Sequence, residues 1–136
     1  MAKSERKKLT RAEERDLDIE IDFLAGLARR APDYVDALEL LGEDYTRRGR
    51  FKDGLQVDLQ LVTLRPGNPL VHYNLACSYS LTDQPEKAFE ALNKALDCGY
   101  RDFHWLSRDP DLAVFREHPL YRKLRTRVRA MRVPVD

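Results

Sequence analysis

Residues 38–45 read LELLGEDY and residues 72–79 read HYNLACSY, so one pattern of large and small side chains occurs twice. The Leu-Gly pair of the first stretch and the Leu-Ala pair of the second are 34 residues apart, as are the tyrosines that close the two stretches. The same spacing joins further landmarks, namely Gly54 with Ala88, and Pro32 with Pro66 and Tyr100. Because several landmarks share one spacing, the chain is predicted to contain an internal structural repeat.

A helical period runs through most of the chain. Apolar residues recur at intervals of three and four in five segments, of which the first covers about residues 12–30. Prolines and glycines separate these segments, and no stretch alternates apolar and polar residues as a half-buried strand does. The chain is therefore predicted to be all-α, with helices of about 12 to 15 residues joined by short turns.

The 34-residue frame resembles the tetratricopeptide repeat, in which W-x2-L-G-x2-Y on a first helix precedes A-x3-F on a second helix and then a proline. This sequence departs from that pattern: Leu38 and His72 stand for the Trp, Asp58 for the aromatic residue, and Tyr100 for the closing proline. The resemblance implies an all-α, tetratricopeptide-like solenoid of about two and a half helix-turn-helix repeats with C-terminal capping helices.

The resemblance also divides the chain into segments. These are a basic, mobile arm at 1–11, an N-terminal capping half-repeat at 12–34, two full repeats at 35–68 and 69–102, and a C-terminal capping segment with a basic helix at 103–136. The stretch Asp109-Pro110-Asp111-Leu112 is similar to the closing segment that follows the last repeat in many bacterial tetratricopeptide proteins. The residues expected to cover the end of the stack are Trp105, Leu106, Leu112, Phe115, Leu120, Tyr121 and Leu124.

In this family the first helix of each pair lines a concave groove that binds a partner. The frame then places the following residues in the groove: Asp36, Glu39, Leu40, Glu43, Arg47, Tyr73, Asn74, Cys77 and Arg108. Asn74 matches an asparagine that grips a peptide carboxylate in co-chaperone members, although Tyr-Asn-Leu-Ala is also ordinary repeat sequence. Glu39 and Glu43 replace the Lys and Asn of those members. Because these two carboxylates would repel the carboxylate of the peptide, binding of such a peptide end is disfavoured. The groove is therefore expected to bind a basic protein segment.

The formal net charge of +1 conceals a polarised chain. Residues 1–11 carry +4, residues 12–118 carry −8, and residues 119–132 carry +6. Four arginines lie on one side of the expected last helix: Arg122, Arg125, Arg129 and Arg132. They form either a solvated face that keeps the end of the stack in water or a surface for an anionic partner, which is nucleic acid, an acidic protein or a membrane surface. The alternative function is therefore a nucleic-acid or ribonucleoprotein accessory protein that uses the basic N-terminal arm and the C-terminal helix.

The sequence contains no arrangement of residues that predicts catalysis, a metal site or a cofactor. No pair of histidines or cysteines has the spacing of metal ligands, and nothing near Cys77 in the sequence resembles an activating histidine. His72 is expected in the core, and Asp109 and Asp111 are expected to cap a helix.

The chain has no apolar run long enough to span a membrane and no secretory signal, which predicts a cytoplasmic protein. A non-enzymatic interaction module is the leading hypothesis, and self-association through the open half-repeat remains an alternative.

Overall fold

The computed structural model describes residues 7–132, and this part of the chain contains helices and turns but no strand. The all-α fold predicted from the sequence is thus confirmed for the described residues. The elements are α1 (Arg11–Arg30), α2 (Val35–Arg48), α3 (Phe51–Leu64), α4 (Pro69–Leu81), α5 (Pro85–Asp97), α6 (Phe103–Leu106), the 3-10 helix η1 (Pro110–Leu112), α7 (Ala113–Arg116) and α8 (Leu120–Met131). None of these helices is long and apolar enough to cross a membrane.

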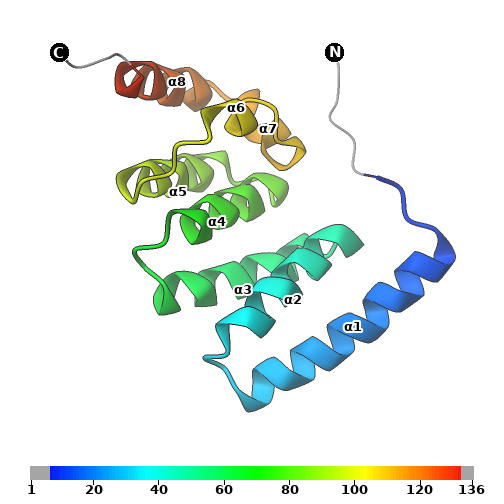
Figure 1. The fold of residues 1–136 in the computed structure, drawn as a ribbon. Coiled ribbons are helices and arrows are strands. Elements are labelled where there is room, and N and C mark those ends of the chain that lie inside the picture. Colours follow the sequence, from blue (N-terminus) through cyan, green and yellow to red (C-terminus); the bar gives the residue numbers. More distant parts are fainter. Residues whose placement is uncertain (1–6, 133–136) are drawn as a thin grey trace.

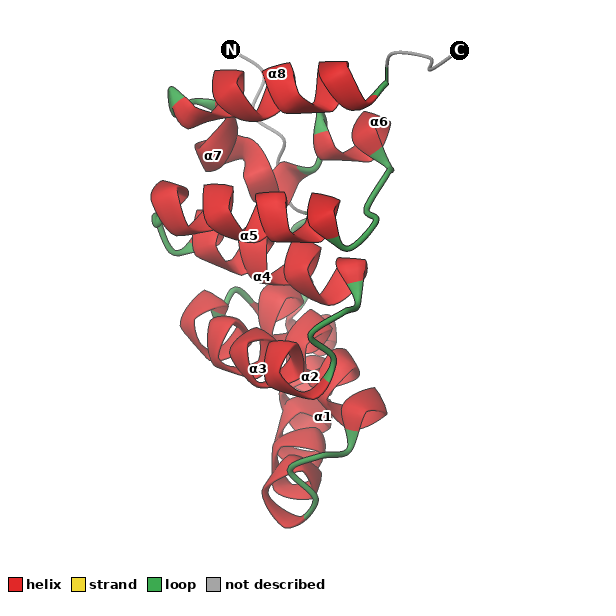
Figure 2. Cartoon of the chain, turned by 90° about the vertical axis from the view of Figure 1, so that its left-hand side faces the viewer, coloured by secondary structure: helices red, strands yellow, loops and turns green. Residues whose placement is uncertain are grey.

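The helices stack in chain order, from α1 at one end to α8 at the other (Figures 1 and 2). Each long helix packs on the next, α1 on α2, α2 on α3, α3 on α4 and α4 on α5, and α8 then covers α5. The segment 35–68 contains α2 and α3, and the segment 69–102 contains α4 and α5. Of the predicted N-terminal arm, residues 1–6 lie outside the described residues.

Local chemistry explains where several helices begin and end. Thr10 and Glu13 form a capping box at the start of α1, in which each side chain accepts a hydrogen bond from the backbone of the other. Asn68 accepts hydrogen bonds from the first turn of α4. Gly49 lies directly after α2 and has a φ of 82°. A glycine ends a helix well at this place because it adopts the left-handed backbone conformation without the steric cost of a Cβ.

Two apolar clusters fill the stack. One joins α1, α2 and α3, and its most buried side chains are Ile21, Leu38, Leu41 and Leu61. The other joins α4, α5 and the segment that follows, and it contains Ala88, Leu92, Leu96, Leu112, Phe115 and Leu124. A Cβ added at Gly42 would lie 3.4 Å from Asp58 Oδ1 and 3.5 Å from Val57 Cγ1, so this small residue lets α2 and α3 approach closely.

The C-terminal segment covers the end of the stack almost as predicted. Leu112, Phe115 and Leu124 have no exposed surface, and the rings of Phe115 and Tyr121 form a T-shaped pair with centroids 6.0 Å apart. Trp105 was expected among these covering residues, but 44% of its surface is exposed. In the four-residue helix α6 it is Leu106 that points inward, and Trp105 therefore lies on the outside.

Candidate functional site

A cleft of about 250 Å³ lies between α2, α3 and α4, with η1 at its edge. Five of the residues that the sequence placed in the groove line it: Glu39, Glu43, Arg47, Asn74 and Cys77. The other lining residues are Gly42, Thr46, Asp58, Leu61, Val71, Ser78, Leu81 and Asp111. The first helices of two successive pairs thus meet at the same hollow.

The remaining groove residues lie elsewhere. Asp36 and Leu40 are exposed on α2 but do not line the cleft. Arg108 is exposed beyond α6, where its guanidinium lies 2.6 Å from Nε2 of His104. Tyr73 is buried in the core and stacks on Tyr100 with ring centroids 4.3 Å apart, so it is not available to a partner in the cleft.

Four carboxylates line the cleft, and Arg47 is the single basic side chain among its lining residues. Glu39 and Glu43 are exposed on α2, whereas Asp58 on α3 is only 8% exposed. The hydroxyl of Ser78 donates a hydrogen bond of 2.5 Å to Asp58 Oδ2. Burial raises the pKa of Asp58 to about 6, against the opposing effect of the Ser78 hydrogen bond. Near neutral pH the cleft therefore presents a negative surface.

The importance of Asp58 was missed from the sequence, where it counted only as a substitution for an aromatic residue. A signal was nevertheless present, because Asp58 interrupts the apolar side of α3 between Leu55 and Leu61. Its partner Ser78 lies 20 residues away on α4, and only the folded chain brings the two together.

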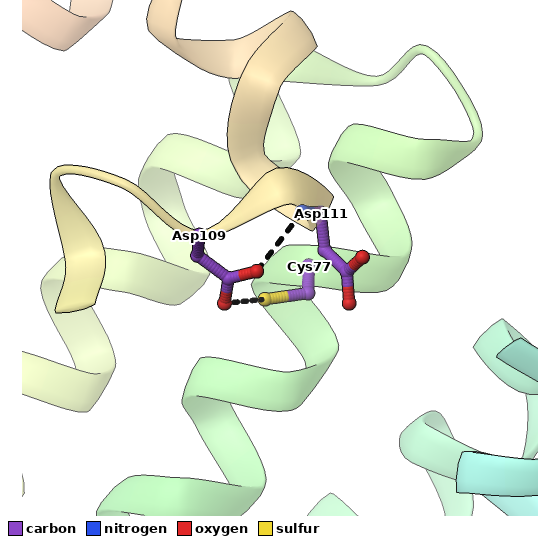
Figure 3. A group of neighbouring side chains, drawn as sticks. All are labelled: Cys77, Asp109 and Asp111. Carbon is purple, nitrogen blue, oxygen red and sulfur yellow. Dashed lines mark hydrogen bonds between the residues drawn. The ribbon is translucent and has the colours of Figure 1, made fainter. Parts of the chain in front are cut away.

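Cys77, Asp109 and Asp111 form a compact group in which the potential ligand atoms lie within 4.8 Å of one another (Figure 3). Asp109 accepts hydrogen bonds from the Tyr73 hydroxyl at 2.7 Å, from Cys77 Sγ at 3.7 Å and from the backbone N–H of Asp111 at 2.9 Å. The last of these is the helix cap predicted for Asp109. Burial, together with the nearby carboxylates, raises the pKa of the Cys77 thiol. The thiol therefore stays protonated at neutral pH, and this state disfavours both nucleophilic attack and metal binding.

His72 lies in the core, as predicted, and its Nε2 is 2.6 Å from the carbonyl oxygen of Pro66. That contact ties α4 to the turn before it. The contact with Pro66 thus accounts for the position of the His72 ring in the core.

Four arginines are predicted for the basic side of the last helix. In the structure Arg122, Arg125 and Arg129 belong to α8, Arg132 directly follows it, and all four are exposed. Arg122, Arg125, Arg129 and Arg132 form no ion pair with a carboxylate of the described residues. Arg127 behaves differently, since it points toward α5 and donates to Asn93 and Asp97. A second hollow of about 240 Å³ lies along this helix, with Leu106, Tyr121 and Val128 beside three of the arginines.

The comparisons with known proteins give a partial match. No protein-family model matches the chain. A segment of 79 residues is 30% identical to a chloroplastic protein of Arabidopsis thaliana. The match covers 56% of this chain and 24% of the plant protein, so the chain spans about a quarter of the length of that relative.

Proposed function

We propose that the chain is a non-enzymatic interaction module, built as a tetratricopeptide-like solenoid, that binds a basic segment of a partner protein in the cleft between α2, α3 and α4. The observation that carries the proposal is the charge of the cleft, where four carboxylates face a single arginine. A lysine or arginine side chain inserted there would neutralise this charge and hydrogen-bond to carboxylate oxygens.

Three features of the helices support the repeat architecture. The first helices of the two pairs begin 34 residues apart, at Val35 and Pro69, and so do the second helices, at Phe51 and Pro85. The turns inside the pairs also correspond, because Gly49 and Asp83 are 34 residues apart and both have a positive φ. The same backbone conformation at the same place in each pair is what a structural repeat requires.

Asp58 is the residue of the cleft that most favours a cationic partner. Its carboxylate is buried and has Ser78 as a hydrogen-bond partner for Oδ2, while Oδ1 faces the space beside Gly42. A buried carboxylate is stabilised when a cation reaches it, because the local dielectric constant is low. Arg47, on the wall of the cleft, supplies one positive charge against the four carboxylates.

Binding of a fluorescein-labelled peptide that alternates lysine and arginine with alanine tests the proposal by fluorescence anisotropy. The double variant Glu39→Lys and Glu43→Lys is expected to weaken the affinity about tenfold, because it reverses two charges at the rim. The matched control is Glu90→Lys with Glu117→Lys, which reverses two exposed glutamates away from the cleft. Equal affinity in both double variants would contradict the proposal.

Nucleic-acid binding through α8 is the second candidate, favoured by the exposed arginines that form no ion pair among the described residues. Its test is the salt dependence of binding to duplex DNA or RNA, since each phosphate contact releases a counterion. Binding that falls steeply with salt would favour this function over the cleft, provided that the binding is also lost when four arginines are changed to alanine: Arg122, Arg125, Arg129 and Arg132.

A further inference from the structure

The outward side of α1 is apolar although nothing among the described residues covers it. Ile19 is 69% exposed and Phe23 is 63% exposed, one helical turn apart. The opposite side of the same helix is also apolar, with Leu17, Ile21 and Leu24 buried against α2. A helix with apolar residues on two opposite sides is typical of a position between two neighbours, not of the end of a stack.

Gly26 lies on this outward side, one turn beyond Phe23, and is covered by the side chains of Arg29 and Arg30. A Cβ added at Gly26 would meet only the ends of these two flexible side chains, Arg30 at 3.5 Å and Arg29 at 3.7 Å. Packing within the chain therefore does not require a glycine, which is less favourable than alanine in a helix interior. The absent side chain leaves a notch at Gly26, one turn from Phe23, that the ends of these two arginine side chains cover. An apolar group from outside would enter this notch only if the two side chains turned away.

The charges of α1 are arranged in two groups. Glu14 and Asp18 face α2 and pair with Arg48, at 3.2 Å and 2.8 Å. Asp16 and Asp22 lie toward the middle of the outward side, and Arg29 and Arg30 lie at its C-terminal end. None of these four outward charges forms an ion pair with another described residue. An antiparallel copy of the same helix would bring the arginines of one next to the aspartates of the other.

We propose that two copies of the chain associate through α1, with the two helices antiparallel and Phe23 of each copy in the notch at Gly26 of the other. In this register Arg29 of the second copy lies opposite Glu20, two residues or about 3 Å along the axis from Asp22. Arg30 of the second copy lies opposite Ile19 and within one turn of Asp16. The contact is isologous, since each copy gives and receives the same groups, and it therefore closes at a dimer.

This surface is separate from the cleft, because the cleft is lined by α2, α3, α4 and η1 and contains no residue of α1. Dimerisation through α1 consequently leaves both clefts open and joins two binding sites in one particle. Such a dimer would bind a partner with two basic segments more tightly than one with a single segment, through effective concentration.

Sedimentation equilibrium of the full chain tests the dimer directly. The wild-type chain is expected to approach twice the monomer mass of 15.9 kDa as its concentration rises. Phe23→Glu is expected to remain a monomer with an unchanged helical circular dichroism spectrum. The matched control is Leu70→Glu, which places the same charge on another exposed apolar residue, 59% exposed on α4, and should leave the dimer intact. A wild-type monomer at every concentration, or equal loss in both variants, would overturn the proposal.

Charge exchange tests the register. Asp22→Arg and Arg29→Asp are each expected to weaken dimerisation about fivefold, whereas the double variant should recover most of the loss because the pair is restored with its signs reversed. Gly26→Gln removes the notch without a backbone clash in the monomer, and it should weaken the dimer while stabilising the isolated helix. If the double charge variant associates no better than either single variant, the antiparallel register is wrong.

Discussion

The two ends of the stack are built differently. At one end α8 buries Leu124 completely and exposes arginines, so its buried apolar residue serves the contact with the helices below. At the other end α1 buries Leu17 and Ile21 but also exposes Ile19 and Phe23. The α8 end, which presents charged side chains to solvent, is therefore called the closed end. The α1 end, which presents apolar side chains to solvent, is called the open end. The comparison shows that a helical stack can stop at one end and still be open to a further helix at the other.

The largest effect is expected at the closed end. Phe115→Ala leaves a cavity in a site with no exposed surface, and it should lower the free energy of unfolding by about 3–5 kcal/mol. Phe23→Ala at the open end removes an exposed ring and should change the stability of the monomer by less than about 0.5 kcal/mol. Chemical denaturation at low protein concentration measures both. Equal losses would show that the ends do not differ in packing.

A pH effect is expected between α1 and α2. Burial, reinforced by the hydrogen bond and the charge of Glu20, raises the pKa of Asp44 to about 7. Its Oδ2 is buried and accepts no hydrogen bond from the described residues, and Arg47 offsets the effect only in part. Because the pKa in the folded chain lies above the value of about 3.9 in the unfolded chain, the folded state binds the proton more tightly. The contribution of Asp44 to stability is thus greatest below about pH 4 and is lost as the pH rises through 7.

Asp44→Asn should consequently stabilise the chain by about 1 kcal/mol at pH 8, where it removes a buried charge, and by a smaller amount at pH 5, where the folded carboxyl is protonated. Thermal unfolding at the two pH values measures the difference. Asp53→Asn is a suitable control, since this aspartate lies on the surface in contact with Arg50. A gain that is the same at both pH values would exclude titration of Asp44 as its cause.

An effect of similar size is expected from the first turn of α1. Thr10→Ala removes the side-chain oxygen that accepts from the backbone N–H of Glu13, and it should cost about 1 kcal/mol. Thr10→Ser keeps that oxygen and should retain most of the stability. The start of α8 has no side-chain cap of this kind from Pro119, so Pro119→Ala provides no equivalent loss of a hydrogen bond. If Thr10→Ala leaves the unfolding midpoint unchanged, the capping box does not stabilise the open end.

The smallest effect is expected on the basic side of α8. Arg129→Ala should change the free energy of unfolding by less than about 0.5 kcal/mol, because the side chain is exposed and forms no ion pair among the described residues. Arg127→Ala should be more damaging, since that side chain ties α8 to Asn93 and Asp97 on α5. Urea denaturation of the two variants compares an outward with an inward arginine on one helix. A greater loss from Arg129→Ala than from Arg127→Ala would contradict this division of the helix.

Much of this fold could be predicted from the sequence because local signals mark it. The helical period and the breakers predicted the helices and the turns between them, and in the structure α5 begins at Pro85 and is followed by Gly99, with a φ of 111°. These features depend on residues close together in the chain. The five groove residues that line the cleft followed from the 34-residue frame together with the resemblance to tetratricopeptide repeats, in which the first helices line a groove.

Tyr73 shows why the rest could not be predicted. The frame assigned it to the groove, but the folded chain buries its ring against Tyr100 and its hydroxyl against Asp109, 36 residues away. Asp58 likewise acquires its raised pKa from burial against α4 and from no neighbour in sequence. Interactions of this kind depend on how the closing segment and successive pairs dock. A spacing rule does not contain that information.

Titration of the ¹⁵N-labelled chain with an unlabelled peptide rich in lysine and arginine, followed by amide chemical shifts, tests the binding cleft most directly. The largest shift changes are expected at residues that line it, such as Gly42, Thr46, Asn74 and Ser78, with little change along α8. Shift changes confined to α8, or changes in the cleft with an acidic peptide but not with the basic one, would contradict the account.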